Sequence, residues 1–270
     1  MQAASPEAIH HIARGGLPTL TELLSADHPR VALGLIGIGA VVWLVAYVLA
    51  IRTGFREKTY AIPLLAVCLN ITWELTHSLI FRPAMPADLY NHLAWLVLDL
   101  IILAQVFRYG RRMQRIEPVR RHFPLVVATT LILSLAGHVS FHRFVTANSI
   151  FPDQNGAVAA YIINLVMSVL FVAMYFGRPD GTGLSRGVAW TKFIGTGLYS
   201  IGNVMVLLRI PEVRYEVQVR KVGEAAWVAA GQVGNNTIHP GFMFFLIAGT
   251  TIFDLLYLWL LYRKPRSTTA

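Results

Sequence analysis

The segment AIPLLAVCLNITWELTHSLIF, from Ala61 to Phe81, decides the fold class of this chain. Its apolar run is as long as the roughly 20 residues that an α-helix needs to cross a bilayer. One acidic residue, Glu74, lies inside the run. Because a carboxylate in hydrocarbon costs about 2.5 to 3.5 kcal/mol on insertion scales, the segment predicts a membrane helix that carries a functional acid.

The remainder of the chain has the same apolar character. Of its 270 residues, 55% are hydrophobic and only 14% are charged, and the mean hydropathy is +0.55. This composition excludes an ordinary soluble domain. We therefore predict an all-α fold, a polytopic membrane bundle of seven transmembrane helices over 31–51, 61–82, 88–108, 123–143, 155–177, 186–208 and 240–262.

The positions of the basic residues predict which ends of the helices lie on the inner side of the membrane. These residues give the chain a formal net charge of +9, but they cluster beside the predicted spans rather than on a separate soluble module, so no nucleic-acid partner is expected. Most of them lie inside if the N-terminus is outside, which the positive-inside rule favours. We predict an N-out, C-in, multi-pass protein of a bacterial inner membrane or the endoplasmic reticulum.

Three segments are expected to lie outside the membrane. Residues 1–30 are predicted to form an amphipathic extramembrane segment, and residues 265–270 a C-terminal tail. Residues 31–264 between them are predicted to form the seven-helix domain. Within the domain, residues 209–239 are predicted to form a long external loop. The alternation of apolar and polar residues over 213–220 indicates a short strand or an interfacial hairpin in that loop.

Three of the predicted helices each place an acid among polar or aromatic residues at helical spacing. These residues are Asn70, Trp73, Glu74 and His77 on the second helix, Asp88, His92, Trp95 and Asp99 on the third, and Asp254 and Tyr257 on the last. Such faces turn inward, because polar groups that face lipid have no partners. We expect Glu74, Asp99 and Asp254 to line one cavity, which suits an elongated, lipid-like molecule.

Other polar stripes, on the fourth, fifth and sixth helices, are interpreted as hydrogen bonds between helices. Lys192 lies near the inner end of the sixth helix, where we expect its stem to snorkel to the interface. His138 and His142, with His77 or His92, have no evident pairing at matched depth on facing helices. No metal site and no cofactor are expected.

Three quoted segments resemble a known family. They are PLLAVCLNITWELTHSLI around Glu74, WLVLD ending at Asp99, and FDLLYLWLLYRK around Asp254. They are similar to the integral-membrane terpene cyclases of fungal meroterpenoid pathways and their bacterial indole-sesquiterpenoid relatives. The likeness covers about Ala61 to Lys264, and it implies that Glu74 and Asp254 are essential catalytic residues.

The resemblance also implies a reaction. Glu74, with or without Asp254, would protonate a terminal alkene or epoxide of a prenylated, in particular farnesylated, substrate, and the polyene would close through carbocations without a metal. The implied substrate-binding residues are Asn70, Trp73, His77, Trp95, Asp99 and Tyr257. The expected partners are this lipophilic small molecule and membrane lipids, with no obligate protein partner.

Two other functions use the same buried acids. A proton-coupled transporter or lipid-binding protein would use them as a proton relay, and a membrane double-bond isomerase would use them to move a proton without closing a ring. Hydrolases, kinases and metal-dependent diphosphate chemistry find no support, because their motifs are absent from the sequence. Product structure separates the three remaining hypotheses.

Overall fold

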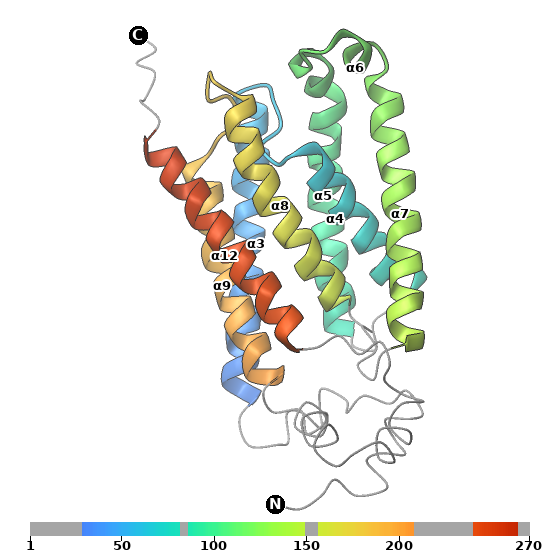
Figure 1. Cartoon of the computed structure of the whole chain (residues 1–270), viewed down its shortest axis with the longest axis vertical. Helices are drawn as coiled ribbons and strands as arrows, with labels where there is room; N and C mark the ends of the chain where they lie inside the picture. The colour runs from blue at the N-terminus through green and yellow to red at the C-terminus, as the bar shows by residue number, and fades with distance from the viewer. Residues whose placement is uncertain (1–28, 82–85, 149–155, 208–239, 264–270) are drawn as a thin grey trace, which may run out of the picture.

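All the secondary structure in the described part of the chain is helical (Figure 1). The computed structural model describes residues 29–81, 86–148, 156–207 and 240–263. The first described helix begins at Pro29, inside the predicted N-terminal segment. The remainder of that segment, the loop over 209–239 with its expected strand, and the tail lie outside the described residues.

Each of the predicted ranges holds a helix. The bounds are α3 (Pro29–Arg56), α4 (Leu64–Leu75) continued by a π-turn η1 (Thr76–Ile80), α5 (Pro86–Met113), α7 (Phe123–Asn148), α8 (Ala157–Gly177), α9 (Arg186–Leu207) and α12 (Pro240–Arg263). A short helix, α6 (Glu117–Arg121), links α5 to α7. Among the described residues, five of these helices are long and apolar enough to cross a membrane, namely α3, α5, α7, α8 and α12. The all-α, multi-pass prediction is therefore confirmed at this level.

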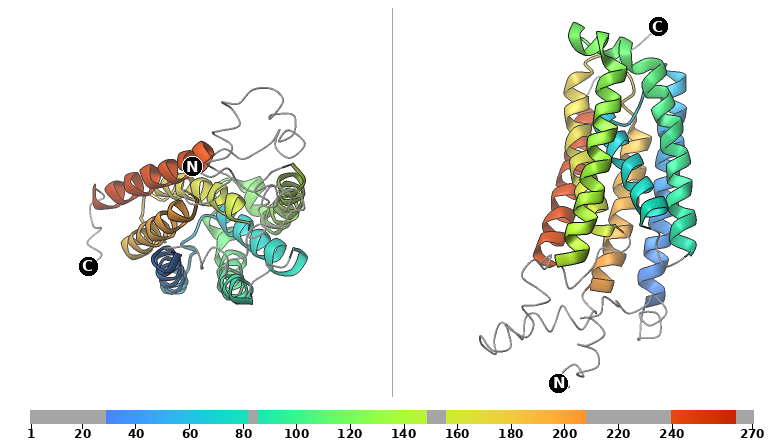
Figure 2. Two further views of the ribbon diagram at one scale, coloured as in Figure 1. Left: turned by 90° about the horizontal axis from the view of Figure 1, so that it is seen from below. Right: turned by 90° about the vertical axis from the view of Figure 1, so that its right-hand side faces the viewer.

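The helices stand side by side as one bundle, with α4 inclined between α5 and α7 (Figures 1 and 2). Helix α4 also packs on α8, while α12 packs on α8 and α9. Helix α3 lies along α9, where glycines on both helices let the backbones approach. A Cβ added to Gly195 would lie 3.1 Å from the carbonyl oxygen of Gly39. Small residues at such contacts are a common basis of helix packing in membranes.

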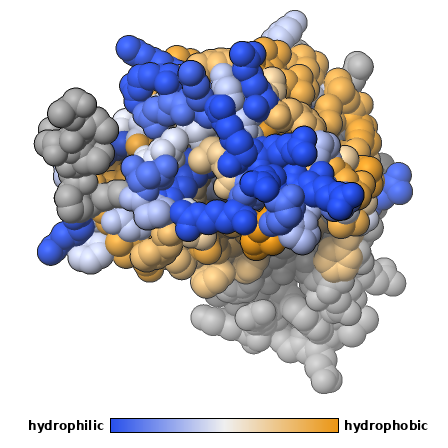
Figure 3. Space-filling view, turned by 90° about the horizontal axis from the view of Figure 1, so that it is seen from above, coloured by the Kyte–Doolittle hydropathy of each residue, from blue (hydrophilic) through white to orange (hydrophobic). Residues whose placement is uncertain are grey.

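The outer surface separates apolar from polar residues along the helix axes. Seen from above, hydrophilic residues gather on the end of the bundle, and apolar residues cover much of its side (Figure 3). The α3–α4 connection, the end of α5, and α6 supply exposed basic residues at Arg56, Lys58, Arg111, Arg112, Arg115, Arg120 and Arg121. This distribution is the one expected for helices that cross a bilayer and end in a basic cap.

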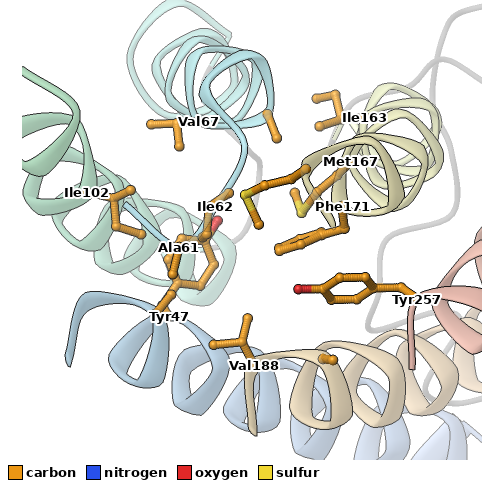
Figure 4. Close-up of a cluster of buried hydrophobic side chains, with 14 of the residues drawn as sticks. Tyr47, Ala61, Ile62, Val67, Ile102, Ile163, Met167, Phe171, Val188 and Tyr257 are labelled. Carbon is orange, nitrogen blue, oxygen red and sulfur yellow. The ribbon is translucent and has the colours of Figure 1, made fainter. Parts of the chain in front are cut away.

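The largest buried apolar cluster joins α3, α4, α5, α8, α9 and α12 (Figure 4). Tyr47, Met167, Phe171 and Tyr257 are members of it. Because membrane helices gain little from burying apolar surface relative to lipid, contacts of this kind hold the helices mainly through close packing. The cluster sets a rigid frame around the polar groups described next.

Candidate active site

A cavity lies between α3, α4, α5, α8 and α9. Four of the predicted site residues line it together, and they are Asn70, Trp73, Glu74 and Trp95. Trp43 and Tyr47 of α3 close another side. Three indole rings and three phenol rings, the latter from Tyr47, Tyr161 and Tyr199, therefore line the same cavity as the Glu74 carboxyl group.

The Glu74 and Asp99 side chains are in direct contact. Glu74 is 1% exposed and Asp99 is fully buried, and their carboxyl groups are close enough to interact directly. Only Glu74 lines the cavity, so Asp99 supports it from α5. No N–H or O–H donor among the described residues reaches Glu74 Oε2 or Asp99 Oδ1. Two such carboxyl groups can form a hydrogen bond with each other only when one of them keeps a proton.

Tyr47 completes this network from α3. Its hydroxyl donates to Asp99 Oδ2 at 2.9 Å and accepts from Asn70 Nδ2 at 2.8 Å. The network ties α3, α4 and α5 together beside the cavity. Tyr47 is not among the predicted site residues, because its only signal in the sequence is one phenol in an otherwise apolar helix.

The predicted residue His77 lies behind the cavity wall rather than on it. Its ring packs against Trp73 with centroids 5.2 Å apart and against His142 at 5.0 Å. It belongs to the π-turn η1, which follows Glu74 after one residue. Such turns change the direction of side chains and are frequent at functional sites. The His77 ring therefore packs against Trp73 from outside the cavity.

The other histidines contact this aromatic cluster or the helix backbone. His92 packs edge-on against Trp73 at 4.7 Å and lines the cavity, whereas a ring nitrogen of His138 lies 3.1 Å from the carbonyl oxygen of Leu69. Within the described residues, no group of three or more His, Cys, Asp or Glu side chains is placed to hold a metal ion.

Gly156 holds the Trp73 indole in place. The Trp73 Nε1–H donates to the Gly156 carbonyl oxygen at 2.9 Å, and the Gly156 backbone has a positive φ of 68°. A Cβ at this position would lie 2.5 Å from His77 Nε2. A side chain here is therefore disfavoured both by the backbone conformation and by contact with a buried ring.

We expect Gly156→Ala to destabilise the protein by about 1–3 kcal/mol, because a left-handed backbone conformation is costly for residues other than glycine. Thermal unfolding in detergent measures the change. Gly137→Ala on α7 is the matched control, since a Cβ there meets nothing within 4 Å. Equal melting temperatures for the two variants would contradict the prediction.

Asp254 lies away from this cavity, in an ion pair with Lys192. Lys192 Nζ is 2.6 Å from Asp254 Oδ1 and 2.8 Å from Oδ2, and Lys192 is only 2% exposed. The prediction that Lys192 snorkels to the interface is wrong, because a carboxylate on α12 offers its ammonium group a partner inside the bundle. The expectation that three acids line one cavity is also wrong, since of these acids only Glu74 does so.

Tyr257, a predicted substrate-binding residue, lies in the core. Its ring packs on Phe171 with centroids 5.1 Å apart, and it does not line the cavity (Figure 4). The opposite cavity wall comes instead from α8 and α9, where Asn164 Nδ2 donates to Thr196 Oγ1 at 3.2 Å. The polar stripes of these two helices were interpreted as contacts between helices, and they form both such a contact and the wall.

The comparisons with known proteins identify the family. Residues 25–266 match the model of the Pyr4-like transmembrane terpene cyclases. The chain belongs to this family. The resemblance found in the sequence is confirmed, and with it an integral membrane protein of the terpene cyclase type. No solved structure matches the chain.

Curated relatives within the family are distant. The chain is similar to terpene cyclase macJ of Penicillium terrestre, with 23% identity over 60% of this chain and 62% of the relative. It is 30% identical to the Pyr4-family terpene cyclase mfmH of Annulohypoxylon moriforme, over 60% of this chain and 66% of the relative. The asnovolin H synthase nvfL of Aspergillus novofumigatus is 26% identical over 63% and 67%. The chain thus spans less than two thirds of the first two relatives.

Proposed function

We propose that this protein is a membrane-embedded cyclase that protonates a terminal alkene or epoxide of a prenylated substrate and guides carbocation ring closure. The observation that carries the proposal is the Glu74–Asp99 contact at the wall of an aromatic cavity. Two buried carboxyl groups in contact repel each other if both are ionised, so the pair retains a proton. Membership of a terpene cyclase family supports the use of that proton for cyclisation.

In the proposed reaction Glu74 transfers its proton to the terminal carbon of the alkene, or to the epoxide oxygen. The electron pair of the alkene forms the new C–H bond and leaves a cation on the more substituted carbon. The next double bond attacks that cation, and each attack closes a ring. The cascade ends when the final cation, or a substrate nucleophile that has attacked it, returns a proton to the ionised Glu74 carboxylate, so the acid is restored and substrate and product have equal mass.

Asp99 and Tyr47 position the acid in this scheme. The Tyr47 hydroxyl donates to Asp99, and this hydrogen bond holds the Asp99 carboxyl group beside Glu74. After proton transfer the same hydrogen bond stabilises the negative charge left on the pair. Asn70 fixes the Tyr47 hydroxyl from the opposite side.

The aromatic wall stabilises the cations. Trp73, Trp95 and Trp43 line the cavity, and ring faces attract positive charge by about 0.5–2 kcal/mol each. Trp73 is held by its hydrogen bond to Gly156, so its ring is already oriented before substrate enters. No described partner accepts the buried Trp95 Nε1–H, which leaves this group available to the substrate.

We expect Trp95→Leu to lower the cyclisation rate about 3–30-fold and Trp95→Phe to lower it less, because phenylalanine keeps a ring face. Product analysis by chromatography measures rate and ring pattern together. Trp259→Leu on α12 is the matched control, since Trp259 is exposed and lies outside the cavity. An unchanged rate and product pattern in Trp95→Leu would contradict the proposed role.

We also propose that α4 with η1, and α9, cross the membrane together with the five helices that are long and apolar enough to do so, with the N-terminus outside and the C-terminus inside. Helix α9 has 22 residues, which rise about 33 Å and match the hydrocarbon thickness. Its Lys192 is neutralised by Asp254, which lowers the cost of insertion. The basic residues around α6 then face inward, as the positive-inside rule favours.

One experiment separates the candidate functions. Membranes containing the protein are incubated with farnesylated indoles, phenols and quinones, and membranes without the protein are the control. A new product of equal mass with an additional ring supports the cyclase. Uptake without a new product supports a transporter, and an isomer with a shifted double bond but no new ring supports an isomerase. Either of the last two outcomes contradicts the proposal.

A further inference from the structure

The Lys192–Asp254 pair connects three helices inside the bundle. Lys192 on α9 donates to both carboxylate oxygens of Asp254 on α12, and to Ser168 Oγ on α8 at 2.7 Å. Both charged residues are buried, with exposures of 2% and 3%. The three N–H donors of the ammonium group therefore each have an acceptor.

This arrangement determines what Asp254 can do. Both of its oxygens accept from a cation, and a carboxyl group that does so is in its ionised form. An ionised carboxylate has no proton to donate. Removal of either partner leaves an unpaired charge among apolar side chains, whereas removal of both charges together is often tolerated.

The pair also supports the cavity that Glu74 lines. Ser168 Oγ donates to the Asn164 carbonyl oxygen at 2.8 Å, and the Asn164 side chain forms the α8–α9 wall with Thr196. Lys192 Nζ lies 5.7 Å from the centre of the Trp43 ring, which lines the same cavity. A shift of the pair would therefore move two walls of the site.

We propose that Asp254 is a positioning residue, the counter-ion of Lys192, and that it acts by holding the α8–α9 wall and Trp43 in place. It is not the proton donor. This inference rests on the cyclase function proposed above. It predicts that the need for Asp254 disappears when the positive charge of Lys192 is removed with it.

The test compares two single variants with the double variant. We expect Asp254→Asn and Lys192→Met each to lower cyclisation about 100-fold or more, because small displacements of a site cost this much. The double variant, Lys192→Met with Asp254→Asn, is expected to recover to within about 10-fold of the unmodified protein. Lys58→Met, which removes an exposed lysine, is the control for loss of a positive charge.

Two further measurements extend the test beyond the cyclisation rate at a single pH. Thermal unfolding in detergent should give lower melting temperatures for both single variants and a restored one for the double variant. The pH profile of turnover in the double variant should match that of the unmodified protein, because the Glu74–Asp99 pair is unchanged. A shifted pH profile would assign a proton-transfer role to Asp254 and overturn the inference.

Two other results would also overturn it. One is an Asp254→Asn protein that melts like the unmodified protein and yet forms no product. The other is a stable double variant that remains inactive. If instead Glu74→Gln retains full activity, the proposed proton donor is wrong, while the melting temperatures still decide whether Asp254 is the counter-ion of Lys192.

Discussion

Glu74→Gln is expected to reduce ring closure by about 10²–10⁴-fold, the usual contribution of a general acid. Glutamine has nearly the same size as glutamic acid, and its amide can still donate to Asp99, so the helix contacts remain. What is lost is the transferable proton on the only one of the three predicted acids that lines the cavity. The rate of product formation from a farnesylated substrate in membranes is the measurement.

The control for Glu74→Gln is Glu57→Gln, the same chemical change at another position. Glu57 lies at the end of the bundle, where it accepts from the Gly183 backbone N–H at 2.7 Å and pairs with Arg56. This variant should retain the activity of the unmodified protein. Equal activity in the two variants would remove Glu74 as the proton donor, provided that both insert and remain monodisperse in detergent.

Asp99→Asn is expected to lower ring closure by about 10–100-fold, which corresponds to the loss of a hydrogen bond to a charged group. Asparagine can still accept from Tyr47, so the change removes only the ability of this position to share a proton with Glu74. Tyr47→Phe should cost less, because it deletes one hydrogen bond and leaves both acids. The measurement is again product formation in membranes.

Coupling between the two acids provides the decisive comparison. If they act as one unit, the double variant of Glu74→Gln with Asp99→Asn should be no slower than Glu74→Gln alone. Losses that multiply would show that Asp99 acts independently of Glu74. A loss in Asp99→Asn no larger than in Tyr47→Phe would likewise contradict the shared-proton mechanism.

Buried acids serve two different purposes in this bundle. The negative charge of Asp254 is balanced by the positive charge of Lys192. Glu74 and Asp99 instead lie beside each other, and one of them must keep a proton for the two to remain together. Burial alone does not distinguish these two cases, because all three residues are at most 3% exposed. The nature of the neighbour decides which acid can donate a proton.

The positions of the helices could be predicted because their signal is local. Apolar length and the spacing of polar residues depend only on neighbours along the chain, so each predicted range holds a helix, and Asn70, Trp73 and Glu74 share one face as expected. Where a prediction was less accurate, at the ends of α3 and α5, the helices continue into basic residues beyond the hydrocarbon-spanning run.

The errors concern contacts between helices. Lys192 was expected at the interface because no sequence rule shows that a carboxylate from α12 will lie beside it. Tyr47 was missed, and Tyr257 was assigned to the site although it packs against Phe171, because one tyrosine in an apolar helix has the same sequence signal in either role.

The sequence by itself determined that this chain is a helical membrane protein of the cyclase family. It also determined that the helices carry acids whose burial in the membrane costs free energy. Only the tertiary structure decided that Glu74 meets Asp99 at a cavity while Asp254 meets Lys192. The physical reason is that these two kinds of interaction act over different distances along the chain. Hydrophobic length acts along one helix, whereas hydrogen bonds and ion pairs form between atoms of different helices, within a few ångströms, once the bundle has packed.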